Sequence, residues 1–211
     1  MRNVTRAVLA SLGLLLLVPA SDALAQRRRG LVDVSHSHER HGLWLAVGLA
    51  AGEDAYRFSA VSEDYGEGLT KPTFSLGIGG TVNPHLRLGG ELKVWADEYF
   101  DEVAGADVTE SLVGGLLVAQ VYPARSFGLF LKGGVGISRS GVDVEFGDGT
   151  GETGFATLVG AGYELRVGRN FFITPMVDLM HHRSSERGDP NGTLHERLIS
   201  FGVNLTFQPG R

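Results

Sequence analysis

A run of alternating residues near the end of the chain, LHERLISFGVNLTF at 194–207, decides the fold. Every second residue from Ile199 to Phe207 is apolar. The alternate residues, from Leu198 to Thr206, form a second face that is small and mostly polar. A period of two predicts a β-strand. Strands of soluble proteins usually end after about 5–6 residues, whereas a tilted strand that crosses a bilayer needs about 9–11. This run is therefore long enough to cross a membrane.

Seven earlier segments share the alternation. We expect strands at 42–52, 71–82, 85–97, 108–122, 126–139, 153–167 and 171–182. The connections between them are alternately short (83–84, 123–125, 168–170) and long (53–70, 98–107, 140–152, 183–193). An up-and-down barrel places alternate connections at opposite ends, and outer-membrane barrels have short periplasmic turns and longer extracellular loops. The sequence thus predicts an all-β, eight-stranded antiparallel up-and-down transmembrane β-barrel over 42–207, with both termini periplasmic.

Proline interrupts this pattern inside the seventh predicted strand. Pro175 has no backbone N–H to donate to a neighbouring strand. We therefore expect an irregularity of the sheet at this position.

The two faces of the predicted strands differ in character. One face is apolar and free of charge in its middle, as in Leu43, Leu45, Val47 and Leu49 of the first strand. The other carries glycines and four cations and four carboxylates: Arg87, Glu91, Lys93, Glu110, Lys132, Glu164, Arg166 and Asp178. An isolated buried charge is very costly. We therefore expect an ion-pair network that plugs the lumen, with glycines making room for the long side chains, and no continuous conduction through so narrow a barrel.

Aromatic residues near the strand ends suggest contacts with the bilayer interfaces. Trp44, Tyr122 and Phe127 lie toward one predicted rim, and Trp95 and Tyr99 toward the other. Because amphipathic rings are favoured at the membrane–water boundary, we expect two aromatic belts.

The beginning of the chain is typical of an exported protein. Arg2 and Arg6 precede an apolar stretch at 7–18, and Ala23-Leu24-Ala25 has the small residues of a cleavage site, which predicts a signal peptide at 1–25. Residues 26–41 lack periodicity and are expected to form a flexible periplasmic leader, with a C-terminal tail at 208–211. The spacing of His36, His38 and His41 would suit a transition metal, but a solvated leader also explains it, so no metal or cofactor is predicted.

With this arrangement of strands, the chain resembles the small eight-stranded outer-membrane β-barrel proteins of Gram-negative bacteria, of the OmpA/OmpX type. The resemblance covers nearly the whole mature chain and is one of architecture, without a diagnostic motif. It implies a monomer in the outer membrane that contacts lipid and lipopolysaccharide and does not bind nucleic acid. It also implies recognition by the barrel-assembly machinery, with Phe207 as the aromatic signal, although in this chain 208–211 follow it.

The long predicted loops indicate where the protein meets its surroundings. Segments 53–70, 98–107 and 140–152 have more carboxylates than cations, and 183–193 is neutral. We expect an acidic extracellular rim and a structural or surface-interacting role. Asp97, Glu98, Asp101 and Glu102 have oxygen ligands that suit divalent cations shared with lipopolysaccharide phosphates; a solvated acidic surface is the alternative.

Two other functions are alternatives to this one, and the first is a lipid hydrolase. His182, Ser184 and Glu196 are similar to the pattern of lipid A 3-O-deacylases, in which Ser184 would be the nucleophile, His182 its base and Glu196 the orienting group. Those enzymes usually have Asn where this chain has Ser185. They also act on the lipid-facing wall, whereas the alternation places His182 and Glu196 inward, so no enzyme is predicted.

The second alternative is a secreted, lipocalin-like ligand-binding barrel. Such a barrel keeps its apolar face inside, so the charged face of this chain would have to point to water. The strand lengths and the difference between the two sets of connections favour the membrane barrel.

Overall fold

The computed structural model describes residues 40–102, 105–144, 150–184 and 192–209. The predicted signal peptide, most of the predicted leader, and His36 and His38 lie outside these residues. The chain divides into two compact units, 1–31 and 32–211, and every described residue belongs to the second. In the described ranges, no helix is both long and apolar enough to cross a membrane.

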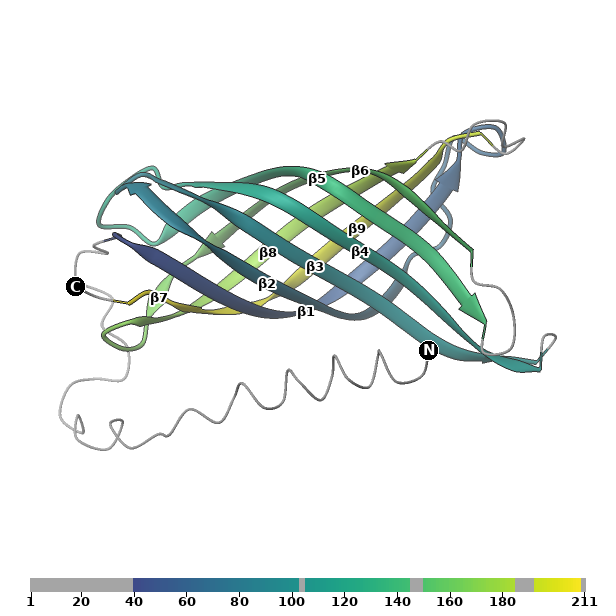
Figure 1. The fold of residues 1–211 in the computed structure, drawn as a ribbon, viewed down its shortest axis with the longest axis horizontal. Helices are drawn as coiled ribbons and strands as arrows, with labels where there is room; N and C mark the ends of the chain where they lie inside the picture. The colour runs from purple at the N-terminus through teal and green to yellow at the C-terminus, as the bar shows by residue number, and fades with distance from the viewer. Residues whose placement is uncertain (1–39, 103–104, 145–149, 185–191, 210–211) are drawn as a thin grey trace. The chain divides into compact units, whose positions relative to one another are not determined.

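The described residues form a closed antiparallel β-barrel (Figure 1). Its strands are β1 (Leu43–Phe58), β2 (Leu69–Asn83), β3 (Leu86–Asp101), β4 (Ala106–Val121), β5 (Leu129–Val144), β6 (Thr150–Tyr163), β7 (Leu165–Arg166), β8 (Phe171–Ser184) and β9 (Leu194–Phe207). Neighbours in sequence pair with each other, β1 pairs with β9, and β6 pairs with β8. Since β7 continues β6 after one residue, the two together form one interrupted strand of the barrel. The barrel is therefore eight-stranded, and the predicted fold class is confirmed.

The interruption between β6 and β7 lies opposite Pro175. The pairing of β6 with β8 ends at Gly162 and Met176, and the pairing of β7 with β8 resumes at Leu165 and Ile173. On the other side of the gap, the backbone N–H of Glu164 still bonds to the carbonyl of Gly128, next to β5. The expected irregularity is confirmed, and its cause is the missing N–H of proline.

The two ends of the barrel differ less in their connections than the sequence predicted. We call the end where β1 begins and β9 finishes the turn end; its connections are 84–85, 122–128 and 167–170. The opposite end is the loop end, with connections 59–68, 102–105, 145–149 and 185–193. Much of what was predicted as long loops is strand, for example 53–58 of β1 and 140–144 of β5. The predicted bounds of the long connections are therefore wrong, because strand pairing continues beyond the residues where the apolar alternation ends.

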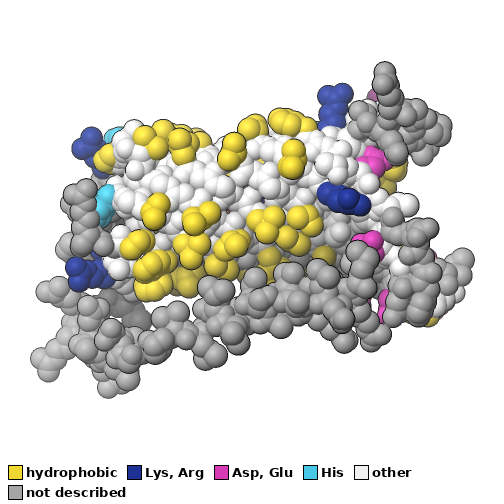
Figure 2. Space-filling view, in the orientation of Figure 1, with side chains coloured by type: hydrophobic (Ala, Val, Ile, Leu, Met, Phe, Trp, Pro, Cys, Tyr) yellow, Lys and Arg dark blue, Asp and Glu magenta, His cyan; other side chains and the backbone are white. Residues whose placement is uncertain are grey.

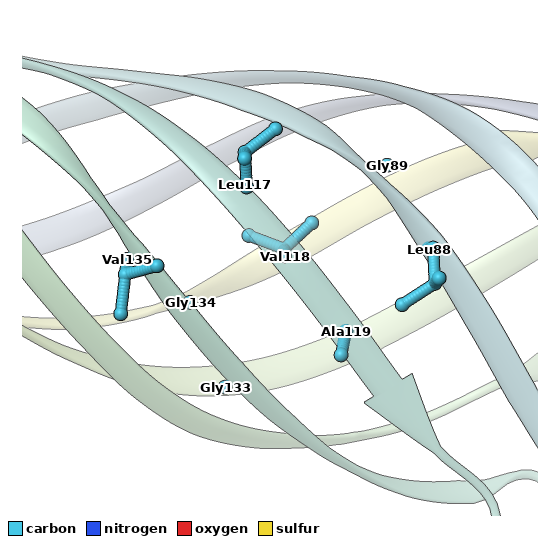
Figure 3. A pocket seen from close by; sticks show the side chains of 8 residues that line it. All are labelled: Leu88, Gly89, Leu117, Val118, Ala119, Gly133, Gly134 and Val135. Atoms are coloured by element: carbon cyan, nitrogen blue, oxygen red, sulfur yellow. The ribbon is translucent and has the colours of Figure 1, made fainter.

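The apolar face of the strands points outward, as predicted. Leu117, Ile137 and Phe201 are 73%, 68% and 65% exposed, and the outward apolar residues cover the middle of the wall in Figure 2. Small residues leave a shallow apolar hollow in this wall between Leu88, Leu117 and Val135, where Ala119 and Gly133 lie (Figure 3). A barrel with this exterior is suited to lipid and not to water, which removes the lipocalin-like alternative.

The lumen is filled partly by apolar side chains. Its buried apolar cluster consists of Trp44, Ala46, Trp95, Leu112, Leu116, Val118, Ala156, Leu158, Met180 and Leu198. Both tryptophans and Tyr122 are buried inside the barrel, so their assignment to interfacial belts is wrong. Trp95 donates to the carbonyl of Gly52 at 3.0 Å, so its indole N–H has a partner inside the barrel.

Candidate functional site in the lumen

The centre of the lumen is crossed by four charged side chains, Glu91, Lys93, Lys132 and Asp178, which we call the central cluster. Lys132 Nζ lies 3.0 Å from Glu91 Oε2 and 2.8 Å from Asp178 Oδ2. Lys93 Nζ lies 2.7 Å from the same Asp178 oxygen and donates to Ser200 at 3.0 Å. All four side chains are buried, and they come from β3, β5 and β8. Two cations and two carboxylates make the cluster neutral, which limits the cost of burying it.

Glycines shape the lumen around this cluster. Gly160 lies opposite Asp178, and a Cβ at Gly160 would come within 2.1 Å of Asp178 Oδ1. Gly79 and Gly89, which pair with each other, instead lie against the ring of Trp44, at 2.7 and 2.6 Å from a Cβ built on each. The expectation that glycines make room for charged groups thus holds at Gly160, but at Gly79 and Gly89 the space is taken by an aromatic ring.

A second buried cluster closes the lumen at the turn end. This turn-end cluster is formed by Arg40, Arg87, Tyr122, Glu164 and Gln208, all nearly inaccessible to water. Glu164 pairs with Arg87 and, at 3.2 Å, with Arg40 Nε. The Tyr122 hydroxyl lies 3.0 Å from Glu164 Oε1, and Arg87 donates to Gln208 at 2.6 Å. The sequence predicted Arg87 and Glu164 for the lumen, but it placed Arg40 in the leader and Gln208 in the tail.

Arg40 is held at this end by several contacts at once. Its guanidinium lies 3.6 Å from the centroid of the Tyr122 ring and donates to the carbonyls of Arg125 and Phe127 at 3.2 and 2.8 Å. Burial raises the pKa of Tyr122, and the charge of Glu164 raises it further, so the hydroxyl stays protonated and available as a donor. Arg40, which the sequence assigned to the leader, therefore belongs to the barrel.

Glu110 and Arg166 are the two predicted lumen charges that join neither cluster. Glu110 accepts a hydrogen bond of 2.9 Å from the Tyr99 hydroxyl near the loop end. Arg166 donates to the carbonyls of Gly168 and Arg169 in the connection to β8, at 3.2 and 3.0 Å. Both lie near strand ends, where the alternation alone does not tell how far a side chain reaches into the lumen.

The three residues of the hydrolase alternative lie inside the barrel. His182, Ser184 and Glu196 are all buried, with His182 opposite Glu196 in the register of β8 and β9. Ser184 donates to Glu152, and His182 Nδ1 lies 2.6 Å from Ser138 Oγ. Serine and histidine thus have other partners, and none of the three faces the lipid. The geometry does not favour a lipid hydrolase.

The carboxylates proposed to bind divalent cations do not converge. Asp97 points inward and pairs with Lys71 at 2.6 Å, whereas Glu98 is exposed. Within the described part of the chain, no group of three or more His, Asp or Glu side chains is arranged to hold a metal ion. The arrangement of Asp97 and Glu98 therefore does not favour the cation site that was one of the two possibilities for 97, 98, 101 and 102.

A closed eight-stranded barrel with an apolar outer wall and buried charges in its lumen defines an integral outer-membrane β-barrel protein. The chain belongs to the family described as Outer membrane protein beta-barrel domain, which it matches over residues 10–207. The family and the fold agree on an outer-membrane location.

Of three similar solved structures, the one with a TM-score above 0.5 supports the fold. Neisserial surface protein A is 12% identical, with a TM-score of 0.52 over 78% of this chain and 97% of that chain. Ail, the attachment invasion locus protein of Yersinia pestis, is 14% identical, with a TM-score of 0.48 over 79% of this chain and 99% of that chain. OprG of Pseudomonas aeruginosa is 12% identical, with a TM-score of 0.46 over 83% and 99%. No curated protein matches the chain in sequence.

Proposed function

We propose that this protein is a closed, non-conducting barrel whose role is structural or surface-interacting and not enzymatic. The observation that carries the proposal is the central cluster, in which Lys132 joins Glu91 and Asp178 across the lumen. Apolar side chains and the turn-end cluster fill the lumen on either side of it. An ion entering the barrel would have to break buried pairs whose members have no water to replace their partners.

The proposed contact surface is the loop end. On the face shown in Figure 2, acidic side chains gather at this end. Glu98, Asp107 and Asp143 are exposed on β3, β4 and β5, and Glu63, Asp64 and Glu67 are exposed in the connection after β1. A surface of this kind favours cationic partners, because long-range attraction speeds their association. The outward orientation of the loop end and the signal peptide at 1–25 are parts of this proposal.

Assembly in the membrane is proposed to use the last strand. The ring of Phe207 lies 5.0 Å from that of Phe171, at the turn end of the wall. Phe207 would be the residue recognised by the barrel-assembly machinery, with Gln208 serving the separate purpose of closing the lumen.

Conductance tests the closed lumen directly. The refolded mature chain, added to a planar lipid bilayer, is expected to give no stepwise current in potassium chloride, because the central cluster closes the path. A double replacement, Lys93→Ala with Lys132→Ala, removes both cations that hold the carboxylates together and is the matched positive control. Regular channel steps from the unaltered protein would contradict the proposal.

Cysteine labelling in intact cells tests the orientation. The chain has no cysteine, so a single introduced thiol reports its own position. Ser62→Cys lies in the connection 59–68 at the loop end, and Ser126→Cys in the connection 122–128 at the turn end; both serines are exposed. A membrane-impermeant maleimide is expected to label Ser62→Cys in intact cells, and Ser126→Cys only after lysis. The reverse pattern would overturn the orientation.

A further inference from the structure

The outer wall of the barrel carries a group of basic side chains that the proposed function does not use. Arg57 on β1, His181 and Arg183 on β8, and His195 and Arg197 on β9 form what we call the basic cluster. These strands lie side by side in the order β1, β9, β8 (Figure 1). All five positions belong to the outward-facing alternation, which continues from the apolar residues Leu179 on β8 and Phe201 on β9.

The register makes these five side chains direct neighbours. His181 pairs with Arg197, and Arg183 pairs with His195, across β8 and β9. Arg57 pairs with the same His195 from the other side. The rings of His181 and His195 lie 5.5 Å apart. Side chains directly opposite each other on one face interact, and like charges placed so are destabilising. Three arginines gathered around two histidines on one small area therefore favour the binding of an anion.

The arginines are held in place by an aromatic ring and have spare donors. The guanidinium carbons of Arg57 and Arg197 lie 5.4 and 4.7 Å from the centroid of Tyr65. The Nε atoms of both are buried and have no hydrogen-bond partner. Considering residues 40–102, 105–144, 150–184 and 192–209, no carboxylate forms an ion pair with Arg57, Arg183 or Arg197.

Other acidic groups of the wall do not neutralise the cluster. Glu53, the outward carboxylate of β1 nearest in register, pairs with Ile199 and lies close to Gly68. Glu98, Asp107 and Asp143 lie on β3, β4 and β5, away from β8 and β9 in the strand order. Glu63, Asp64 and Glu67 lie in the connection that also holds Tyr65, but none of them forms an ion pair with a described residue of the cluster. The loop end thus has acidic side chains on β3, β4 and β5 and a basic cluster on β1, β9 and β8, an arrangement that the charge counts of the segments did not indicate.

The height of the cluster on the wall favours a lipid phosphate as the ligand. It follows directly on the apolar band, at the place where Leu179 and Ile199 give way to His181 and Arg197. A cation on the lipid-facing wall is costly at the bilayer midplane but costs little near the interface. Phosphate groups of lipid headgroups lie at that level, and guanidinium groups bind phosphate through two parallel hydrogen bonds.

We propose that the basic cluster binds the phosphate group of a phosphorylated glycolipid in the leaflet next to the loop end. Arg57 and Arg197 supply the preorganised guanidinium groups, Arg183 supplies an exposed one, and the two histidines supply ring N–H donors. The inference rests on the proposed orientation only for the choice of leaflet. Binding in detergent does not depend on orientation, so failure here and failure of the cysteine labelling are distinguishable.

Native mass spectrometry of the refolded mature chain in a non-ionic detergent tests the site. The probes are bisphosphorylated lipid A, the same lipid without phosphates, and inorganic phosphate. We expect a tightly retained bisphosphorylated lipid, and a loss of affinity of tenfold or more in the Arg57→Gln, Arg197→Gln double variant. Arg139→Gln, which removes an exposed arginine on β5, is the matched control and should bind like the unaltered chain.

Three results would contradict the proposal. Equal binding of the lipid without phosphates would mean that acyl chains on the wall hold it, and equal binding of inorganic phosphate would mean that the ligand is not a lipid. Unchanged affinity in the double variant would overturn the site itself. If that variant fails to fold, as judged by gel mobility before and after boiling, Arg183→Gln is used in its place; it is expected to lose affinity severalfold, and no loss would contradict the proposal.

Discussion

Replacing Lys132 with alanine is expected to lower the free energy of unfolding by about 3–5 kcal/mol, the usual effect of removing one partner from a buried ion pair. Lys132 is the residue that joins Glu91 to the rest of the central cluster. Without it, Lys93 still pairs with Asp178, but Glu91 remains buried without a described cation. The cost comes from that uncompensated carboxylate more than from the lost attraction itself.

Unfolding in urea, followed by tryptophan fluorescence in detergent micelles, measures this effect. Trp44 and Trp95 are buried in the lumen and would report its opening. Arg139→Ala is the control, because Arg139 is exposed on β5 and forms no ion pair with a described carboxylate, so its loss should cost about 1 kcal/mol or less. Combining Lys132→Met with Glu91→Gln removes both members of one pair and should recover much of the lost stability. A Lys132→Ala barrel as stable as the Arg139→Ala barrel would contradict the role given to the central cluster.

The alternation of the strands was enough to predict which way most side chains point. Phe201, Val203 and Leu205 are exposed, as the period of two in the last strand requires. The same rule placed Glu91, Lys132 and Asp178 on the inner face, where they are buried. This part of the structure is predictable because the membrane allows only one face of a spanning strand to be apolar.

Two errors came from general tendencies that local packing overrode. Trp44 and Trp95 were assigned to interfacial belts because tryptophan is favoured there, yet their positions in the alternation already placed them inside. Glycines at 79 and 89 leave the space that the Trp44 ring fills. Strand ends were also missed, because at the loop end the ladder continues through polar residues such as Asp143 that give no apolar signal.

Contacts that depend on closure of the barrel gave no sequence signal. Arg40 meets Glu164 across more than half of the chain, and Gln208 meets Arg87, only because β1 and β9 pair. The basic cluster has the same origin, since Arg57 becomes a neighbour of His195 through that pairing. Single-segment charge counts cannot detect a site assembled from three strands, two of which come from opposite ends of the barrel sequence.

Glu164→Gln is expected to destabilise the barrel by about 3–5 kcal/mol as well, because it leaves two buried guanidinium groups without their carboxylate. The side chains of Arg40 and Arg87 are 0% and 1% exposed, so water cannot replace Glu164. The glutamine amide also has an NH2 group, a hydrogen-bond donor, which would face the N–H donors of Arg40 and Arg87. Urea unfolding measures the loss, and Arg166→Gln, two residues away and bonded only to described carbonyls of its own connection, should change stability by less than about 1 kcal/mol.

A second replacement at the turn end separates the contribution of the residue that was predicted to lie in the leader. Arg40→Gln leaves Glu164 paired with Arg87 and bonded to Tyr122, so it should cost less, about 1.5–3 kcal/mol for a lost hydrogen bond to a charged group. If Arg40→Gln costs nothing, Arg40 is not part of the barrel, whatever Glu164→Gln shows. If Glu164→Gln itself costs no more than Arg166→Gln, the turn end is open to water, and the central cluster would have to close the lumen alone.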